Sequence, residues 1–452
     1  MNNINFLMRQ LKNKSHPIFW LKNKYYYSKD LISLYNNWRI IIQKKKINPS
    51  SLIAFHDDYN LSSIAFFFAA IKENLIVVNL PIKQHNLIKT VPCKYFANIK
   101  DFKILRIKCS MKNNINDILP RYQRKKKSGI IIFSSGSSGQ PKAILHDFNL
   151  LVNKFKKKRQ GYKTLLMLTF DHIGGINTLL SSLINVDGLA ISTDNKRDTK
   201  TICKIIEKTK AELLPTTPTF LNMLLFSEQY KLNDLSSLKL ITFGTEPMPN
   251  YILKKLRKIF PKIHLKQTYG LSEIGIMRTK DKKNGSLFVK VGGEDYKTKV
   301  INNHLYIKSK TNMVGYLNFE QPFDKNGWLN TGDRVIKEKD GYIKILGRDS
   351  DLINIGGEKF YPQEIENVLL KHKNVIDTKV YSKTHKLLGN YVIADIILNK
   401  QIKKINIDSY KISLRNYCKK KLPKFKIPSR FIIKEYDQII NNRFKKITNN
   451  QK

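Results

Sequence analysis

A loop of small hydroxylated residues and glycines, residues 134–142, is the stretch of this sequence best suited to chemistry. It reads Ser134, Ser135, Gly136, Ser137, Ser138, Gly139, Gln140, Pro141, Lys142. Glycines let the backbone approach an anion closely, and the N–H and O–H groups of such a loop can surround phosphate oxygens. A flexible linker is the alternative interpretation of a Ser/Gly run. The apolar stretch 129–133 before the loop, and the Pro-Lys pair at its end, favour a phosphate-binding loop. It is not a Walker loop, because no Gly-Lys-Ser/Thr opens a helix.

Three further short motifs carry groups that nucleotide chemistry requires. They are the hexapeptide Thr268, Tyr269, Gly270, Leu271, Ser272, Glu273, the triplet Thr331, Gly332, Asp333, and the pair Gly347, Arg348. A carboxylate can place the metal ion that neutralises a departing pyrophosphate, and a carboxylate can also accept hydrogen bonds from both hydroxyls of a ribose. Each motif alone could be a surface turn. Their combination, with Asp340-Gly341-Tyr342 between the last two, is a strong signal.

Together with the loop, these motifs resemble the adenylate-forming superfamily, which includes acyl-CoA and aryl-CoA ligases, luciferases and the adenylation domains of peptide synthetases. The usual loop of that family is Thr-Ser-Gly-Thr-Thr-Gly-x-Pro-Lys-Gly. This chain has Ser for each Thr and Ala143 for the last Gly, which keeps the small or hydroxylated chemistry. The resemblance implies that Tyr269 lies against the adenine, that Ser272 reaches phosphate and that Glu273 helps to hold Mg²⁺. It implies a ribose contact for Asp333 and a ribose or phosphate contact for Arg348.

The stretch that follows Gly347 resembles the junction between the large and small domains of that family. Ser350 takes the hinge position there. Gly356 and Gly357 would form the loop that moves in for the second half-reaction and lines the thioester-forming tunnel. The stretch is also compatible with a purely structural interpretation, a Gly-rich turn before a helix that begins at Pro362. The two interpretations do not exclude each other. The expected domains are 1–348, a large AMP-binding domain, and 349–452, a small mobile domain.

The catalytic lysine near the end of the family sequences has two candidates here. Relatives end with Gly-Lys-x-x-Arg, whose Lys reaches the substrate carboxylate and the α-phosphate during adenylation. Lys445 matches if Phe444 has replaced the Gly and Thr448 the Arg, whereas the order of Lys followed by an apolar residue favours Lys446. Both lysines therefore remain candidates.

The acyl pocket allows two alignments. In one, His172 and Gly175 match the His-x-x-Gly of acyl- and aryl-CoA ligases, and the tandem glycines favour this alignment. In the other, Asp171 matches the Asp of amino-acid-activating domains, which pairs with the substrate amine. The segment Gly244, Thr245, Glu246 resembles the family segment between the adenine and acyl sites, where Glu246 has a role in specificity or in structure alone.

The order of elements predicts an α/β fold. Apolar runs at 52–55, 76–80, 165–168, 189–191 and 212–214 are typical of buried strands, and they alternate with helical segments such as 177–184 and 199–209. From residue 286 short strands and turns follow, at 286–291, 297–301 and 305–309. We therefore expect a large N-terminal domain of parallel sheets with crossover helices and a small barrel-like subdomain. A smaller α+β C-terminal domain, joined by a hinge, completes the expected fold.

The composition limits which compartment and which partners we expect for this chain. The four cysteines lie far apart, which suits a reducing cytoplasm and gives no metal pattern, and the first residues lack the order of a signal peptide. No apolar run reaches the roughly 18 residues of a membrane span. A net charge of +47 is spread along the whole chain, which favours compositional bias over a specific nucleic-acid partner. Such charge should still help anions such as ATP and CoA to approach.

The sequence therefore predicts an ATP-dependent, AMP-forming ligase that activates a carboxylic acid as an acyl-adenylate and passes it to CoA. Its co-substrates and cofactor would be ATP, CoA and Mg²⁺. One alternative is a stand-alone enzyme that loads an amino or acyl acid onto the pantetheine of a carrier protein. A second alternative is a catalytically decayed ligase scaffold that binds nucleic acid. The sequence names neither the acid nor the oligomeric state.

Overall fold

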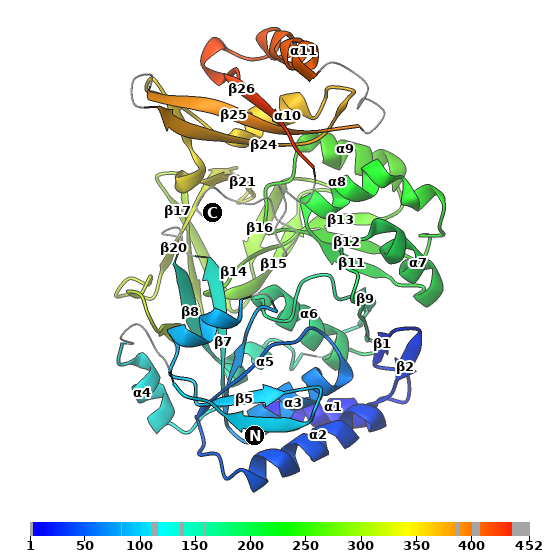
Figure 1. Ribbon diagram of the computed structural model, residues 1–452, viewed down its shortest axis with the longest axis vertical. Helices are drawn as coiled ribbons and strands as arrows, with labels where there is room; N and C mark the ends of the chain where they lie inside the picture. The colour runs from blue at the N-terminus through cyan, green and yellow to red at the C-terminus, as the bar shows by residue number, and fades with distance from the viewer. Residues whose placement is uncertain are drawn as a thin grey trace.

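The computed structural model describes residues 3–82, 84–109, 116–135, 140–157, 159–385, 389–399 and 407–435. Three seven-stranded sheets form the body of the molecule, and a separate three-stranded sheet lies at its C-terminal end (Figure 1). The chain is thus an α/β protein with a distinct C-terminal domain, as the sequence predicts. No helix among the described residues has the length and hydropathy that a membrane span requires.

The first sheet is parallel except at one edge, where β1 and β2 form an antiparallel pair. Its strands, in spatial order, are β13 (His264–Gln267), β12 (Leu240–Phe243), β11 (Leu213–Thr216), β9 (Lys163–Leu165), β10 (Leu189–Ile191), β1 (Phe19–Leu21) and β2 (Lys24–Tyr26). The helices that pack with these strands are α7 (Thr199–Thr209), α8 (Pro218–Ser227) and α9 (Asn250–Ile259), which share one apolar core with them.

The second sheet is mixed, because its central strands are parallel and its outer strands antiparallel. Its strands are β19 (Gly315–Tyr316), β8 (Pro141–Asp147), β7 (Gly129–Ser135), β4 (Ile76–Asn79), β3 (Leu52–Phe55), β5 (Tyr95–Asn98) and β6 (Lys103–Arg106). Alternate side chains of β3 enter two different cores, Ile53 in one and Leu52 in the other, so both faces of the sheet are covered.

Helices cover both faces of this second sheet. They are α1 (Asn3–Lys12), α2 (Ser28–Lys44), α3 (Leu61–Lys72), α4 (Ile118–Arg124), α5 (Phe148–Asn153) and α6 (Ile173–Ile184), with the 3₁₀ helix η1 (His85–Thr90). Helix α3 is apolar on every side and is buried along nearly its whole length, as expected of a helix without a polar face.

The third sheet is antiparallel throughout and corresponds to the subdomain of short strands. Its strands are β14 (Tyr269–Leu271), β15 (Gly275–Asp281), β16 (Phe288–Gly292), β21 (Ile343–Arg348), β20 (Leu329–Lys337), β18 (His304–Ser309) and β17 (Tyr296–Ile301). A tight turn joins β20 to β21, where the Gly341 N–H donates to the Glu338 carbonyl at 3.0 Å.

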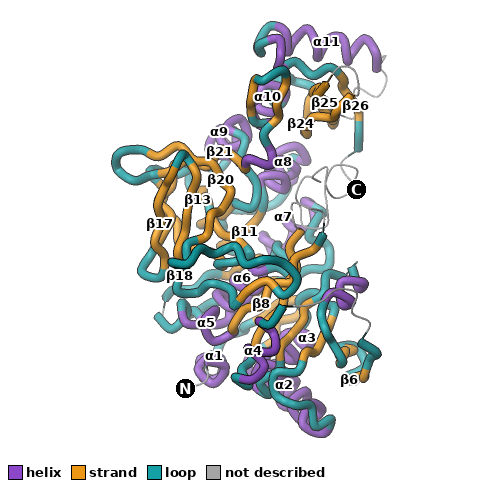
Figure 2. The backbone as a smooth tube through the Cα atoms, turned by 90° about the vertical axis from the view of Figure 1, so that its left-hand side faces the viewer, coloured by secondary structure: helices purple, strands orange, loops and turns teal. Residues whose placement is uncertain are grey.

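The C-terminal domain has its own apolar core. It contains β22 (Ile353–Ile355), β23 (Glu358–Phe360), α10 (Pro362–Leu369), β24 (Val375–His385), β25 (Gly389–Leu398), α11 (Ile407–Lys419) and β26 (Arg430–Ile433). It packs over α8 and α9 of the large domain (Figure 2). Hydrogen bonds cross this contact: for example, Asn222 Nδ2 donates to the Ile376 carbonyl at 2.9 Å, and the Asn250 N–H donates to Asn367 Oδ1 at 3.1 Å.

Most of the predicted elements exist, and their ends are where prediction and structure differ. The helix expected at 177–184 begins at Ile173, because the His172 side chain accepts a hydrogen bond from the Gly174 N–H and caps it. The strand expected at 165–168 ends at Leu165, since the chain then leaves the sheet. The strand expected at 212–214 runs from Leu213 to Thr216.

Candidate active site

Asp333 stands at the centre of the site. Strands β20 and β21 place it directly opposite Arg348, and Arg348 Nε donates to Asp333 Oδ1 at 3.3 Å. The Tyr269 hydroxyl, from β14, donates to the other carboxylate oxygen. Burial raises the pKa of Asp333 above the usual range of a carboxyl group, and the Arg348 charge opposes that rise. The arrangement presents one buried carboxylate and one half-exposed guanidinium side by side.

Glu273 forms a second polar group close to the first. Its Oε1 accepts a hydrogen bond of 2.5 Å from the Tyr316 hydroxyl, and its backbone carbonyl accepts one of 2.7 Å from the Met313 N–H. Arg348 lies within electrostatic reach of both Glu273 and Asp333, so the two groups belong to one site. Burial, followed by the Glu273 charge, raises the pKa of Tyr316 and keeps its hydroxyl protonated.

The donors around Glu273 fit a hard cation. Among the described residues, no three His, Cys, Asp or Glu side chains cluster as a complete metal cage. Mg²⁺ is commonly held by only one or two carboxylates together with substrate phosphates and water. Because Tyr316 occupies only Oε1 of Glu273, the carboxylate keeps oxygen lone pairs that can serve a metal ion.

The predicted phosphate loop connects β7 to β8 as an antiparallel pair. Ser134 stands opposite Lys142, and Ser135 stands opposite Pro141. The four residues at the tip, Gly136, Ser137, Ser138 and Gly139, lie outside the described residues. The Lys142 ammonium group lies 4.8 Å from the centre of the Tyr316 ring and 5.3 Å from that of Phe319, where the ring faces attract it. Lys142 and Glu273 therefore meet at the same tyrosine.

A short segment fixes Tyr316 beside the loop. Strand β19 pairs with β8, with Gly315 opposite Leu145 and Tyr316 opposite Ile144. The pairing extends on both sides, since the Val314 N–H donates to the Leu145 carbonyl and the Leu317 N–H donates to the Ala143 carbonyl. We call residues 313–317 the bridging segment, because it touches both the strand after the loop and Glu273.

Ser272 and Thr268 are positioned through their backbones. The Ser272 carbonyl lies 2.8 Å from His146 Nε2, a buried imidazole on β8. Burial lowers the pKa of His146 to about 4. The Thr268 N–H and hydroxyl both donate to the Phe243 carbonyl. A Cβ atom on Gly244 would stand 2.6 Å from Thr268 Oγ1, so only glycine fits there.

The turn after β12 presents the remaining predicted residues of this region. Thr245 adopts a φ of +71° and is exposed, and Glu246 is half-buried. Glu246 Oε2 accepts a hydrogen bond of 2.6 Å from the Thr219 hydroxyl on α8. Gly270 lies against Ile276 and the Gly275 carbonyl, with no space for a Cβ. Glu246 is thus held toward α8, which is also the helix that contacts the C-terminal domain.

The acyl-pocket candidates lie at the start of α6. His172 caps this helix, and Asp171 is buried beside it. Tyr59 is buried nearby, and burial, followed by the charges of Asp58 and then Asp171, raises the pKa of its hydroxyl. The Tyr59 ring stacks on Phe170, with the ring centres 4.9 Å apart.

Gly356 and Gly357 form the turn between β22 and β23. Their φ angles are +59° and +92°, and no atom lies within 4 Å of a Cβ built on either residue. The turn therefore requires glycine for its backbone conformation and not for close packing. Ser350 is exposed in a short 3₁₀ segment, Asp349–Asp351. Lys445 and Lys446 lie outside the described residues.

Tyr316 and His146 are the site residues that the sequence motifs miss. Tyr316 stands 43 positions after Glu273 and belongs to no short motif. His146 follows the loop on β8, inside an apolar run that indicates only a strand. The sequence signal for His146 is its place as the single His of an apolar strand that directly follows the predicted phosphate loop.

Two family models match this chain. A family model described as AMP-binding enzyme matches residues 43–316. A second model, described as AMP-binding enzyme C-terminal domain, matches residues 364–441. The first match includes Lys142, Glu273 and Tyr316 and covers more than half of the chain.

Similar proteins include a 2-succinylbenzoate–CoA ligase from Bacillus subtilis (strain 168), which is 26% identical over 354 residues, or 73% of this chain and 69% of that protein. Among solved structures, an anthranilate CoA ligase in complex with anthranoyl-AMP has a TM-score of 0.80 at 17% identity, covering 99% of this chain and 95% of that one. The o-succinylbenzoate CoA synthetase from Bacillus subtilis, in complex with its acyl-adenylate intermediate, has a TM-score of 0.73 at 20% identity and covers 99% and 97%. These structures show that the fold is shared.

Proposed function

The chain belongs to the AMP-binding enzyme family and is an AMP-forming CoA ligase, and we propose the roles of its residues in that reaction. In the first step, a carboxylate oxygen of the acid bonds to the α-phosphorus of ATP, the bond to the β-phosphate oxygen breaks, and pyrophosphate leaves. In the second step, the sulfur of CoA bonds to the acyl carbon and AMP leaves. Both steps depend mainly on alignment and charge neutralisation.

Asp333 and Arg348 fix the nucleoside in this proposal. The two carboxylate oxygens of Asp333 already accept from Tyr269 and Arg348, and each retains a lone pair for a ribose hydroxyl. Tyr269 keeps Asp333 in one orientation, and the aromatic ring borders the nucleoside. The exposed side of Arg348 remains available to a phosphate or ribose oxygen.

Lys142, Glu273 and the serines of the loop hold the phosphates. Lys142 lies over Tyr316, and the same tyrosine orients Glu273. Bound at Glu273, Mg²⁺ would neutralise charge on the leaving pyrophosphate. Ser134, Ser135 and residues 136–139 would donate to the phosphate oxygens, and Ser272 adds a hydroxyl from the neighbouring turn. A lysine of the tail, Lys445 or Lys446, would approach the α-phosphate.

The proposal rests on one observation: two clusters of hydrogen-bonded polar side chains lie close together. Asp333, Arg348 and Tyr269 form the first, and Glu273 with Tyr316 forms the second. A surface turn would leave these side chains exposed and unconnected. Here five residues from four separate strands and one turn converge, which supports a nucleotide site where the second and third sheets meet.

The test is pyrophosphate release from ATP and Mg²⁺ with a panel of fatty, aryl, succinyl-aryl and amino acids, each with and without CoA. We expect release with at least one non-amino acid, and thioester formation only when CoA is present. Release with amino acids, lost in Asp171→Ala, would replace this proposal by the amino-acid-activating alternative. No release with any acid, together with a linear dependence of log affinity for nucleic acid on log salt, would favour a decayed scaffold.

Two further expectations belong to the proposal. All four cysteines are free in the described structure, which suits the reducing cytoplasm expected from the sequence. The natural acyl acceptor is CoA, as it is for the relatives by name, and a carrier protein is the alternative. Transfer of the acyl group to holo carrier protein at a higher rate than to CoA would contradict that choice.

A further inference from the structure

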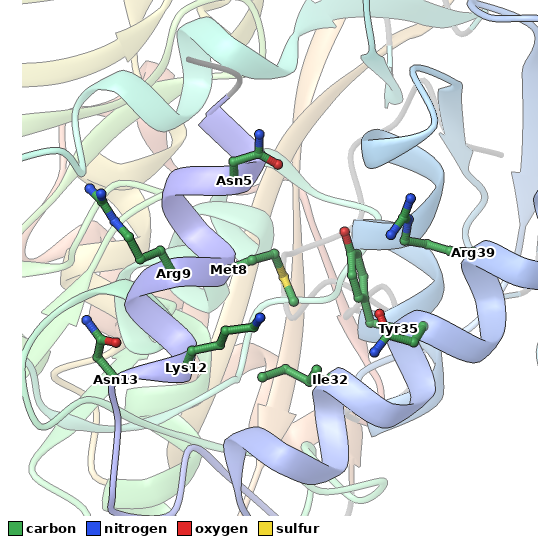
Figure 3. Close-up of a pocket in the computed structure, with 9 residues that line it drawn as sticks. Asn5, Met8, Arg9, Lys12, Asn13, Ile32, Tyr35 and Arg39 are labelled. Atoms are coloured by element: carbon green, nitrogen blue, oxygen red, sulfur yellow. The ribbon is translucent and has the colours of Figure 1, made fainter.

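A groove of about 390 Å³ lies between α1 and α2, away from the active site. Figure 3 shows the two helices with the residues that line the groove. These are Asn5, Met8, Arg9, Lys12, Asn13, Ile32, Tyr35, Asn36 and Arg39. In Figures 1 and 2, α1 and α2 lie at the end of the molecule opposite the C-terminal sheet, and the groove shares no residue with the proposed nucleotide site.

The charges along the groove are all positive. Arg9, Lys12 and Arg39 are cations, and no lining residue is an acid. Arg39 Nε donates to Glu73 Oε1 at 2.7 Å, and its guanidinium lies 5.7 Å from the Tyr35 ring centre. This pairing holds Arg39 in one orientation. The side chains of Arg9 and Lys12 have no hydrogen bond or ion pair with another described residue. Lys12 points toward α2 and Arg9 lies at the outer edge of the groove (Figure 3), so uncompensated positive charge remains in the groove and at its edge.

The neutral lining residues add donors and an apolar floor. Lys72 Nζ donates to Asn5 Oδ1 at 2.8 Å, so the Nδ2 group of Asn5 remains as a donor. Lys72 also adds a fourth cation at the rim of the groove. Burial raises the pKa of Tyr35, so its hydroxyl stays protonated at neutral pH. Met8 and Lys12 point from α1 toward α2, and Ile32 lies across from them (Figure 3).

We propose that the groove between α1 and α2 binds a phosphate group. Phosphate carries more charge than a carboxylate and presents three or four acceptor oxygens, which matches several cations and amide donors better than a single carboxylate would. The floor of Met8 and Ile32 suits the carbon skeleton of a phosphate ester. The phosphate can belong to a diffusible molecule or to the headgroup of an anionic lipid, since both present the same oxygens.

The test compares two double variants of the full chain. Arg9→Gln with Lys12→Gln removes two cations from the groove. Lys204→Gln with Lys208→Gln removes two exposed cations from α7 and is the matched control. Binding of inorganic phosphate and of glycerol phosphate is measured by calorimetry at constant ionic strength, with AMP present to fill the nucleotide site. Binding to phosphatidylcholine vesicles with and without phosphatidylglycerol is measured by sedimentation.

We expect the groove variant to lose roughly tenfold or more in phosphate affinity while the control changes less than about twofold, because two charged hydrogen bonds are removed only in the first. If soluble phosphates bind in this way, the ligand is diffusible. If only vesicles with phosphatidylglycerol do, it is a lipid headgroup. Equal losses in the two variants, or no binding by the unchanged protein, would overturn the site and assign the effect to net charge. Pyrophosphate release should stay unchanged in both variants, which separates this site from the active site.

Discussion

The Tyr316 hydroxyl donates to Oε1 of Glu273 at 2.5 Å, across 43 positions of sequence. The same ring lies beneath the ammonium group of Lys142. One tyrosine therefore orients the proposed metal-binding carboxylate and holds the lysine of the phosphate loop. A residue that no motif identifies thus connects the two groups that we propose to handle phosphate.

Tyr316→Phe tests that connection. The ring remains beneath Lys142, whereas the hydrogen bond to Glu273 is lost. Removal of a hydrogen-bond partner that orients a metal ligand typically lowers metal affinity by about 10- to 100-fold. We expect the Mg²⁺ concentration for half-maximal pyrophosphate release to rise by about tenfold, with ATP binding in the absence of metal unchanged. Tyr342→Phe, at a tyrosine in the β20–β21 hairpin, is the control. An unchanged Mg²⁺ requirement would remove Tyr316 from the metal site.

Asp333→Ala tests the nucleotide site. Loss of charged hydrogen bonds to the ribose at a buried position costs about 2–3 kcal/mol, or roughly 30- to 150-fold in ATP affinity. Calorimetry on the folded variant measures this directly. Asp340→Ala removes an exposed carboxylate from the hairpin that joins the same two strands and should leave affinity unchanged. Equal ATP affinity in the two variants would contradict the assignment of Asp333.

His146 predicts a pH dependence of stability. Its pKa is about 4 in the folded protein because burial disfavours the imidazolium, and it returns to about 6.5 on unfolding. The unfolded chain therefore binds a proton that the folded chain does not. Above pH 6.5, His146 is neutral in both states and does not lower the free energy of unfolding. As the pH decreases from 6.5 toward 4, the free energy of unfolding falls by about 3 kcal/mol in total.

The measurement is urea unfolding of the wild-type protein and of His146→Gln between pH 7 and pH 4.5. Glutamine keeps a donor for the Ser272 carbonyl but does not titrate. The variant should lose less stability than the wild-type protein over this range. Parallel curves would show that His146 does not control the acid sensitivity.

Gly357→Leu separates the two half-reactions. We expect normal adenylate formation and a lower rate of thioester formation, because the turn would enter a narrow thiol channel in the second step. Gly356→Asn is the control, since asparagine tolerates the left-handed conformation that position 356 adopts. Single-turnover assays of each step provide the readout. An equal decrease in both steps would assign the turn a purely structural role.

The tail lysines are distinguished by single variants. A cation between the carboxylate and the α-phosphate acts mainly in the transition state, so its removal typically lowers the rate by about 10²–10³. One of Lys445→Ala and Lys446→Ala should therefore be nearly inactive in adenylation and the other nearly normal. The inactive one should still form thioester from supplied acyl-adenylate and CoA. Wild-type adenylation by both variants would show that the tail has no catalytic lysine.

Local patterns predicted the elements of this fold well where burial was one-sided or complete. The helix at Thr199–Thr209 was predicted to its ends, because it is amphipathic and Asp198 accepts from the N–H groups of its first turn. The strand at 165–168 was misjudged, since an apolar run that leaves a sheet cannot be distinguished from one that stays in it.

The candidate site divides in the same way. Tyr269, Glu273, Asp333 and Arg348 could be recognised because their short motifs keep type and spacing. Tyr316 could not, because its role arises from the pairing of β19 with β8, a contact between segments about 170 residues apart. The tail lysines could be proposed only as a pair, and the tip of the loop lies outside the described residues.

The bridging segment, residues 313–317, also constrains how this chain can change in length. It is hydrogen-bonded to β8 on one side and, through Met313, to the Glu273 carbonyl on the other. Inserting or deleting one residue there would turn Tyr316 to the opposite face of its strand. If the phosphate loop were exchanged for that of a relative, the bridging segment would therefore have to be exchanged together with it. The two segments act as one structural unit although they lie far apart in the sequence.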